Sequence, residues 1–151
     1  MRASAVFAAG STVLVLLLGS PVWAQDTSLV GVWKSIDDKT KKERSIIRIS
    51  EVNGQLEGVV EKVYDQPGDD PAHLCKECKG DLKDKPIVGM KILRGLKKDG
   101  AAWTGGEILD PKNGRVYKAK ITPSKDGKSL DVRGFIGVSL IGRTQTWLRE
   151  Q

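Results

Sequence analysis

The two cysteines, Cys75 and Cys78, are separated by two residues and are the side chains best suited to carry chemistry. In an oxidising compartment such a pair forms a local disulfide by default. A redox-active dithiol is an alternative, although the helix start that lowers a thiol pKa in thioredoxin-like proteins is not visible here. A metal site that adds His73 and, as fourth ligand, Asp69 or Asp70 is another, but nothing in the sequence marks either carboxylate for that role. We therefore expect a structural disulfide, no metal ion and no other cofactor.

Hydrolytic and phosphate chemistry find no support in the sequence. It contains no Gly-x-Ser-x-Gly elbow, and its single histidine lies beside the cysteines. No glycine-rich loop follows a strand and opens a helix, as phosphate-binding loops do. The residues therefore predict a protein that is not an enzyme.

Tryptophan and arginine recur near the two ends of the chain. Trp33 lies in the first apolar segment, and Arg133 alternates with apolar residues in the next-to-last one. One parity of the last segment holds Arg143, Gln145, Trp147 and Arg149. If these polar faces point inward, they offer fixed donors to a carboxylate or a phosphate. If they point outward, they form a solvated face.

The first 24 residues have the features of an export signal. Arg2 supplies the positive start, residues 13–18 form the apolar centre, and Ala24 is the small residue expected at the cut. The apolar run is shorter than the roughly 20 residues of a transmembrane helix, so we expect no stable membrane span. Cleavage after Ala24 would release a single domain, residues 25–151, into the periplasm or the medium.

Composition is that of an ordinary globular protein, with 29% charged and 39% hydrophobic residues and a net charge of +6. The positive balance weakly favours anionic ligands or envelope groups. Export and the small number of aromatic residues make nucleic acid a poor partner.

The elements that must position these residues are strands. Apolar runs between turn signals predict eight of them: 29–36, 45–52, 55–64, 87–93, 101–109, 115–122, 129–136 and 139–149. Asn53-Gly54 between two such runs is the strongest hairpin signal. Short connections place sequence neighbours side by side, and closing the sheet removes its exposed edges. The sequence therefore predicts an all-β, eight-stranded antiparallel up-and-down barrel.

Residues 65–86 interrupt this pattern with both cysteines and several prolines and glycines. A loop of about 22 residues is unusual in a compact domain and is generally functional or specially anchored. It could therefore serve as a contact surface for a protein partner in the envelope.

Gly31-Val32-Trp33 resembles the first-strand motif of the lipocalin-like superfamily, in which a late arginine packs over the indole. Arg143 and Arg149 are the matches available for that arginine. Further motifs extend the likeness over nearly all of 29–149: Cys75-Lys76-Glu77-Cys78-Lys79-Gly80-Asp81, Trp103-Thr104-Gly105-Gly106-Glu107-Ile108, Asp110-Pro111-x-x-Gly114-x-x-Tyr117 and Gly142-Arg143-Thr144-Gln145-x-Trp147-x-Arg149. Together they resemble a family of small exported bacterial proteins with no assigned activity. That resemblance implies export and a lipocalin-like barrel.

Three functional hypotheses follow. The first is a non-enzymatic periplasmic module that binds a small amphipathic or anionic ligand, with Trp33, Arg133, Arg143 and Trp147 in its lining or closed end. The second is a filled barrel that acts as an envelope protein-interaction module through its cysteine loop. The third is a thiol–disulfide protein that uses Cys75 and Cys78.

Overall fold

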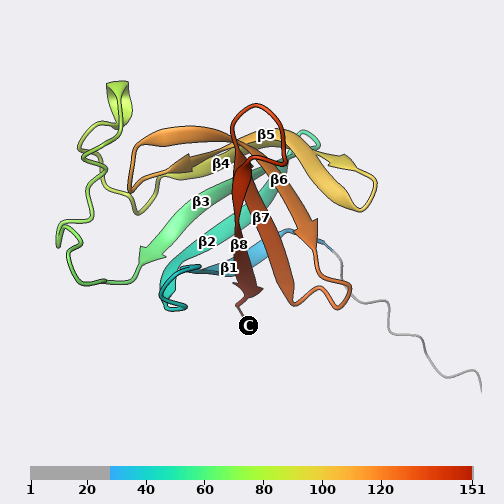
Figure 1. Ribbon diagram of the computed structural model, residues 1–151, viewed down its shortest axis with the longest axis horizontal. Coiled ribbons are helices and arrows are strands. Elements are labelled where there is room, and N and C mark those ends of the chain that lie inside the picture. Colours follow the sequence, from blue (N-terminus) through green and yellow to red (C-terminus); the bar gives the residue numbers. More distant parts are fainter. Residues whose placement is uncertain (1–27, 151) are drawn as a thin grey trace, which may run out of the picture.

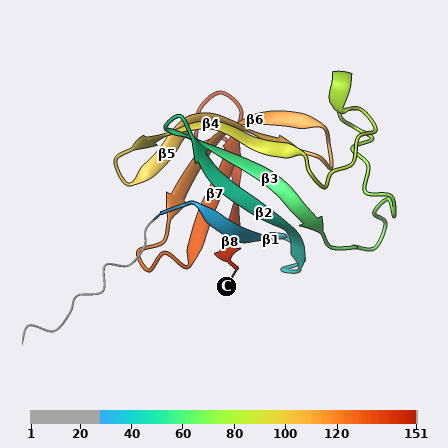
Figure 2. The same ribbon diagram turned by 180° about the vertical axis from the view of Figure 1, so that it is seen from behind.

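The computed structural model describes residues 28–150 and shows a closed barrel of eight antiparallel strands, each paired with its neighbours in sequence (Figures 1 and 2). The strands are β1 (Gly31–Ile36), β2 (Glu43–Val52), β3 (Gln55–Val63), β4 (Lys91–Asp99), β5 (Ala102–Asp110), β6 (Arg115–Pro123), β7 (Ser129–Phe135) and β8 (Gly142–Arg149). β1 pairs with β8, which closes the barrel and confirms the predicted fold class. The predicted export signal lies outside the described residues.

Residues 28–150 contain no helix with the length and apolar character needed to cross a bilayer. The one helical turn among them is the 3-10 helix η1 (Gly80–Leu82), in the long loop between β3 and β4.

The connections at the two ends of the barrel differ in length. One end, which we call the closed end, has the short connections after β2, β4 and β6. The first of these is the predicted Asn53-Gly54 turn, whose φ angles of 51° and 75° confirm the hairpin signal. The opposite end, which we call the mouth, has the connections 37–42, 64–90, 111–114 and 136–141.

Apolar side chains line the interior of the barrel and alternate along the strands with charged residues on the outer face. The largest fully buried ones are Trp33, Trp147, Ile47, Ile49, Leu56, Leu93, Leu96, Ile121 and Leu130. Outward-facing charges pair across neighbouring strands, as Arg94 does with Glu107 at 3.0 Å. Burial of the inner face is what fixes the register, because a slip of one residue would turn every apolar side chain to water.

The long loop 64–90 is anchored at several points. A disulfide joins Cys75 to Cys78, and both cysteines are buried in one cluster with Ile92 and Leu109. Ile92 has the parity opposite to the inward-facing Leu93, so the loop covers part of the outer face of β4 and β5. The expectation of a disulfide and of a specially anchored loop is thus met, because the cysteine turn is buried against the outer face of the barrel.

Ion pairs and backbone contacts complete the anchoring of this loop. The guanidinium of Arg44 on β2 donates to both carboxylate oxygens of Asp69, at 2.8 and 3.3 Å. An isolated bridge joins Leu74 to Pro86, and the amide of Gly89 donates to Val60 O at 2.7 Å. The loop is therefore held at both of its ends and at its cysteine turn.

Replacing both Cys75 and Cys78 with serine is expected to lower the free energy of unfolding by about 2 kcal/mol. The chain-entropy model gives this value for a four-residue ring. Urea unfolding followed by circular dichroism measures the change. Wild-type protein unfolded in excess reductant is the control and should match the double variant. An unchanged midpoint would show that the disulfide does not stabilise the fold.

Candidate functional site

Trp33 and Arg149 seal the closed end of the barrel. The Trp33 indole is fully buried, and its Nε1 donates to Leu29 O at 2.9 Å. The guanidinium of Arg149 lies 4.2 Å from the centre of the Trp33 ring system. Its Nε donates to Gly127 O at 2.8 Å and its Nη2 to Ser28 O at 2.6 Å. This stack of cation on indole ties the first strand to the last and to the β6–β7 turn.

The polar parity of β8 faces the interior. From the closed end to the mouth, this face of β8 carries Arg149, Trp147, Gln145 and Arg143. In cross-strand register Trp33 pairs with Arg149, and Trp147 lies between Ser35 of β1 and Leu130 of β7. Ser35 and Leu130 are buried, so the Trp147 side chain is inside the barrel. Gln145, one step nearer the mouth and half-buried, is next to Val132 in register.

Trp147 carries a buried donor that is not used by the fold. The side chain is 1% exposed, yet its Nε1 has no hydrogen-bond partner among the described residues. The nearby hydroxyl of Ser35 is satisfied by the Ser45 hydroxyl at 2.7 Å. Leaving a buried donor unpaired costs about 1–3 kcal/mol, and such groups in native structures call for an explanation.

Arg143 stands at the rim of the mouth. Its Nε donates to Asp38 Oδ2 at 2.6 Å, and a second contact joins its Nη2 to Oδ1. Hydrogen bonding to Asp38 raises the pKa of Arg143, and the charges of Asp110 and Asp37 act in the same direction. The same pair holds the pKa of Asp38 below its ordinary value. The ion pair therefore persists at neutral pH and joins β8 to the β1–β2 loop across the rim.

Arg133 lies on the outside of the barrel, which corrects the expectation that it lines the interior. Its neighbours Leu130 and Val132 take the inward positions of β7, so Arg133 points outward. Its guanidinium donates to Thr144 Oγ1 at 2.8 Å, to Ser139 O at 2.5 Å and to Leu140 O at 3.1 Å. Of the four predicted ligand-binding residues, the structure thus places Trp33 and Trp147 inside the barrel, Arg143 at the rim of its mouth and Arg133 on its outer face.

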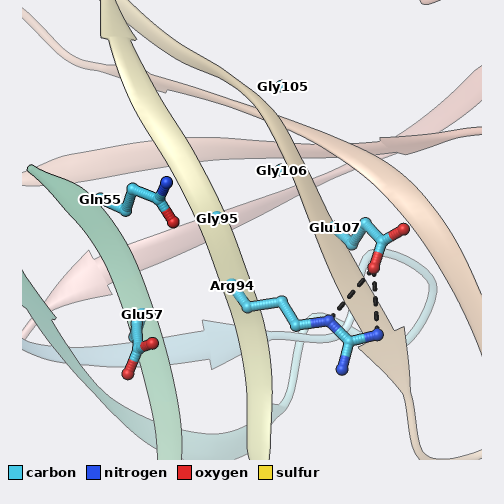
Figure 3. A pocket seen from close by; sticks show the side chains of 7 residues that line it. All are labelled: Gln55, Glu57, Arg94, Gly95, Gly105, Gly106 and Glu107. Carbon is cyan, nitrogen blue, oxygen red and sulfur yellow. Dashed lines mark hydrogen bonds and ion pairs between the residues drawn. The ribbon is translucent and has the colours of Figure 1, made fainter. Parts of the chain in front are cut away.

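An outer hollow of about 400 Å³ crosses β3, β4 and β5 (Figure 3). It lies over Gly95, Gly105 and Gly106, where the regular pairing of β4 with β5 is interrupted. A Cβ on Gly106 would come within 2.4 Å of Arg94 O, so only glycine allows this approach. The charged side chains around the hollow are paired, Arg94 with Glu107 and Glu57 with Lys91. Sequence patterns alone did not predict this hollow, although the Gly105-Gly106 pair is a signal for it.

The residues considered for a metal site have other partners. His73 Nε2 lies 2.8 Å from Asp65 Oδ1, Asp69 pairs with Arg44, and both cysteine sulfurs are in the disulfide. Within residues 28–150, no group of three or more histidine, cysteine or acidic side chains could hold a metal ion.

Comparisons with known proteins agree with this architecture. A family model described as "Uncharacterized protein conserved in bacteria (DUF2147)" matches residues 31–149. A solved structure, described as protein HP1028 from the human pathogen Helicobacter pylori and as belonging to the lipocalin family, superposes with a TM-score of 0.70. It is 21% identical, and the match covers 82% of this chain and 84% of that one. No curated protein matches the sequence significantly.

Proposed function

We propose that this chain, which belongs to the DUF2147 family of uncharacterised bacterial proteins, binds a small amphipathic molecule in the mouth-side half of its barrel. The observation that carries the proposal is the unpaired Nε1 of the buried Trp147. A buried donor without a protein partner is satisfied when a ligand oxygen accepts from it. The lipocalin-like architecture, a barrel of eight strands, has an interior of the size that can hold one small ligand.

The groups around and above Trp147 indicate the chemistry of such a ligand. Towards the mouth, the Gln145 amide offers a second polar contact on the same strand. Ile108 and Tyr117 lie together beneath Gly134, where an added Cβ would come within 3.5 and 3.4 Å of their side chains. These half-buried side chains and the buried Val132 provide an apolar wall. A molecule with an aliphatic body and an acceptor head, such as a fatty acid, matches this combination.

Arg143 would contribute by exchanging partners. In the structure its guanidinium is paired with Asp38 at the rim, four residues from Trp147 on β8, and an anionic head that passed the mouth on its way to Trp147 would compete for it during entry. Arg133, on the outer face, would act only through the loop that it holds. Trp33 would not contact the ligand and would contribute only by sealing the closed end of the barrel, opposite to the mouth. We place this activity in the periplasm or outside the cell, in line with the predicted export signal and the disulfide.

A Trp147→Phe variant tests the proposal, because phenylalanine keeps most of the apolar volume and removes the donor. Native mass spectrometry of the non-denatured protein should first show extra mass that is lost on unfolding. Titration with dodecanoate as a probe should then give a Kd about tenfold higher for the variant, since one hydrogen bond to a charged head is removed. Unfolding in urea should show a loss of only about 1–2 kcal/mol, which is the cost of a smaller ring at a buried position, because no protein hydrogen bond is broken.

A Trp103→Phe variant is the matched control. Trp103 is half-buried on β5 at the closed end, and the same substitution there should leave the dodecanoate affinity unchanged. A bare mass combined with no binding of the probe would overturn the proposal. Equal affinity in the wild type and Trp147→Phe would show that the indole donor is not the binding group.

The anchored cysteine loop favours a second candidate, a docking surface for a protein partner in the envelope. The disulfide and the Arg44–Asp69 pair fix its shape, and it exposes side chains of both signs: Lys76, Glu77, Lys79, Asp81, Lys83, Asp84 and Lys85. Shortening residues 76–84 should then abolish partner capture and leave dodecanoate binding intact. The thiol–disulfide hypothesis is less well supported, because both sulfurs belong to residues no more than 2% exposed and an attacking thiolate needs access.

A further inference from the structure

The β7–β8 loop, residues 136–141, exposes an unusual number of apolar side chains. Four of its six residues are aliphatic and largely in solvent: Ile136 (62% exposed), Val138 (59%), Leu140 (91%) and Ile141 (70%). We call these four the apolar tip. Single exposed aliphatic residues are normal, but a contiguous group of them usually indicates a surface that meets another apolar phase.

Hydrogen bonds from β7 and within the loop hold its backbone in place. Arg133 on β7 donates to the carbonyls of Ser139 and Leu140, at 2.5 and 3.1 Å, and the Ile141 amide donates to Val138 O at 3.0 Å. These bonds satisfy the loop backbone from the protein side and leave the apolar side chains facing outward. In Figure 1 the loop between β7 and β8 stands clear of the strands at the top of the view.

Unpaired positive charges lie beside the apolar tip. Lys118 and Lys120 lie on the outer face of β6. Their partners in register on β7 are Phe135 and Arg133, which come one and three residues before Ile136. Within the described part of the chain, neither lysine is in an ion pair, whereas Arg143 on β8 is neutralised by Asp38. Val116, 46% exposed on the same face of β6, extends the apolar surface towards the mouth.

We infer that the apolar tip inserts into the surface of an anionic phospholipid bilayer, with Lys118 and Lys120 against the lipid phosphates. Apolar side chains at the acyl boundary with lysines at headgroup level are the arrangement by which proteins bind to a membrane surface without spanning it. A second copy of the chain fits less well, because a twofold contact through the tip would bring the same unpaired lysines towards each other. Docked in this way, the barrel would turn its mouth towards the lipid. The inference goes beyond ligand binding and does not depend on it.

Co-sedimentation with vesicles tests this inference. Full-length mature protein should bind vesicles of phosphatidylglycerol and phosphatidylcholine mixed in equal parts, and binding should weaken as salt is raised. A Leu140→Ser/Ile141→Ser variant should lose at least about tenfold in partition coefficient, because its two most exposed anchors are gone. A Lys118→Gln/Lys120→Gln variant should lose roughly thirtyfold in low salt and much of its salt dependence.

Control variants at the closed end distinguish binding through the apolar tip from nonspecific binding to vesicles. Val52, the last residue of β2 and 45% exposed, lies at the opposite end of the barrel, as do the exposed Lys97 and Lys98 on β4. Val52→Ser and Lys97→Gln/Lys98→Gln should bind the vesicles as the wild type does. Trp147→Phe should also bind the vesicles as the wild type does. Failure of the ligand-binding proposal can therefore be distinguished from failure of the membrane-binding inference.

Three results would overturn the inference. One is equal binding to vesicles of phosphatidylcholine alone. Another is unchanged binding in both the tip and the lysine variants. The last is a dimer in solution that Leu140→Ser/Ile141→Ser converts to a monomer, since the tip would then be an interface between copies of the chain.

Discussion

A Trp33→Ala variant is expected to lose about 3–5 kcal/mol of the free energy of unfolding. Trp33 is fully buried at the closed end, so the substitution leaves a large cavity where the barrel is sealed. It also removes the hydrogen bond to Leu29 O and the indole on which Arg149 stacks. Since small domains have only about 5–15 kcal/mol of stability in total, much of the margin would be gone.

Urea unfolding followed by far-ultraviolet circular dichroism measures this loss, and two further variants divide it. Trp33→Phe keeps an aromatic ring under Arg149 and removes the bond to Leu29 O, so its loss should be clearly smaller. Trp103→Ala removes the same side chain from a half-buried position and should also cost less. A loss below about 1 kcal/mol in Trp33→Ala would contradict a sealing role for the indole.

The barrel could be predicted because most of its determinants are local. Asn53-Gly54 requires a tight turn with positive φ, and the alternation in β6 and β7 sets which residues face inward. The pairing of Trp33 with a late arginine joins the chain ends, and the structure selects Arg149 rather than Arg143 for that contact. Each of these signals agrees with the closed architecture, which is the situation in which sequence patterns are informative.

Strand boundaries were harder to predict because tertiary contacts decide them. The strand predicted at 87–93 is found at Lys91–Asp99. Ile87 is apolar, but its amide donates to His73 O at 2.8 Å within the long loop, and Gly89 turns the chain with a φ of 88°. The strand predicted at 139–149 begins only at Gly142, because Arg133 binds the carbonyls of the loop before it.

The site was partly predictable for a related reason. Alternation in β7 already placed Leu130 and Val132 inward, so an outward Arg133 was the simpler interpretation. In β8 the alternation does not say which face is inside, since Leu148 is 44% exposed while the polar parity holds the buried Trp147. Only closure of the barrel against Ser35 and Leu130 settles that orientation. The unpaired Nε1 is a property of packing and has no sequence signal.

Replacing Gly114 with alanine is expected to release the cysteine loop from the barrel and to cost about 3 kcal/mol or more. Gly114, between β5 and β6, has a φ of +67°, and a Cβ there would lie 1.8 Å from Glu77 O. The obstacle is backbone of the disulfide turn, which cannot rotate away as a side chain can. Cys75 Sγ is also 3.4 Å from Pro111 O, so the β5–β6 turn contacts the cysteine loop at more than one point.

A Gly54→Ala variant separates the two causes of this loss, which are the positive φ of the glycine and the clash of the added Cβ with Glu77 O. Gly54 has a φ of +75° in the β2–β3 turn, but nothing lies within 4 Å of the Cβ that alanine would add. It should therefore show only the conformational cost of about 1–2 kcal/mol. Gly114→Ala should exceed it, and amide hydrogen exchange at residues 75–78 should accelerate in that variant alone. Because Asp69 and Arg44 still anchor the start of the loop, β2 should keep its protection. Equal losses in the two variants, with unchanged exchange at the cysteine turn, would mean that the loop is held by its own bonds and not by its seat on the β5–β6 turn.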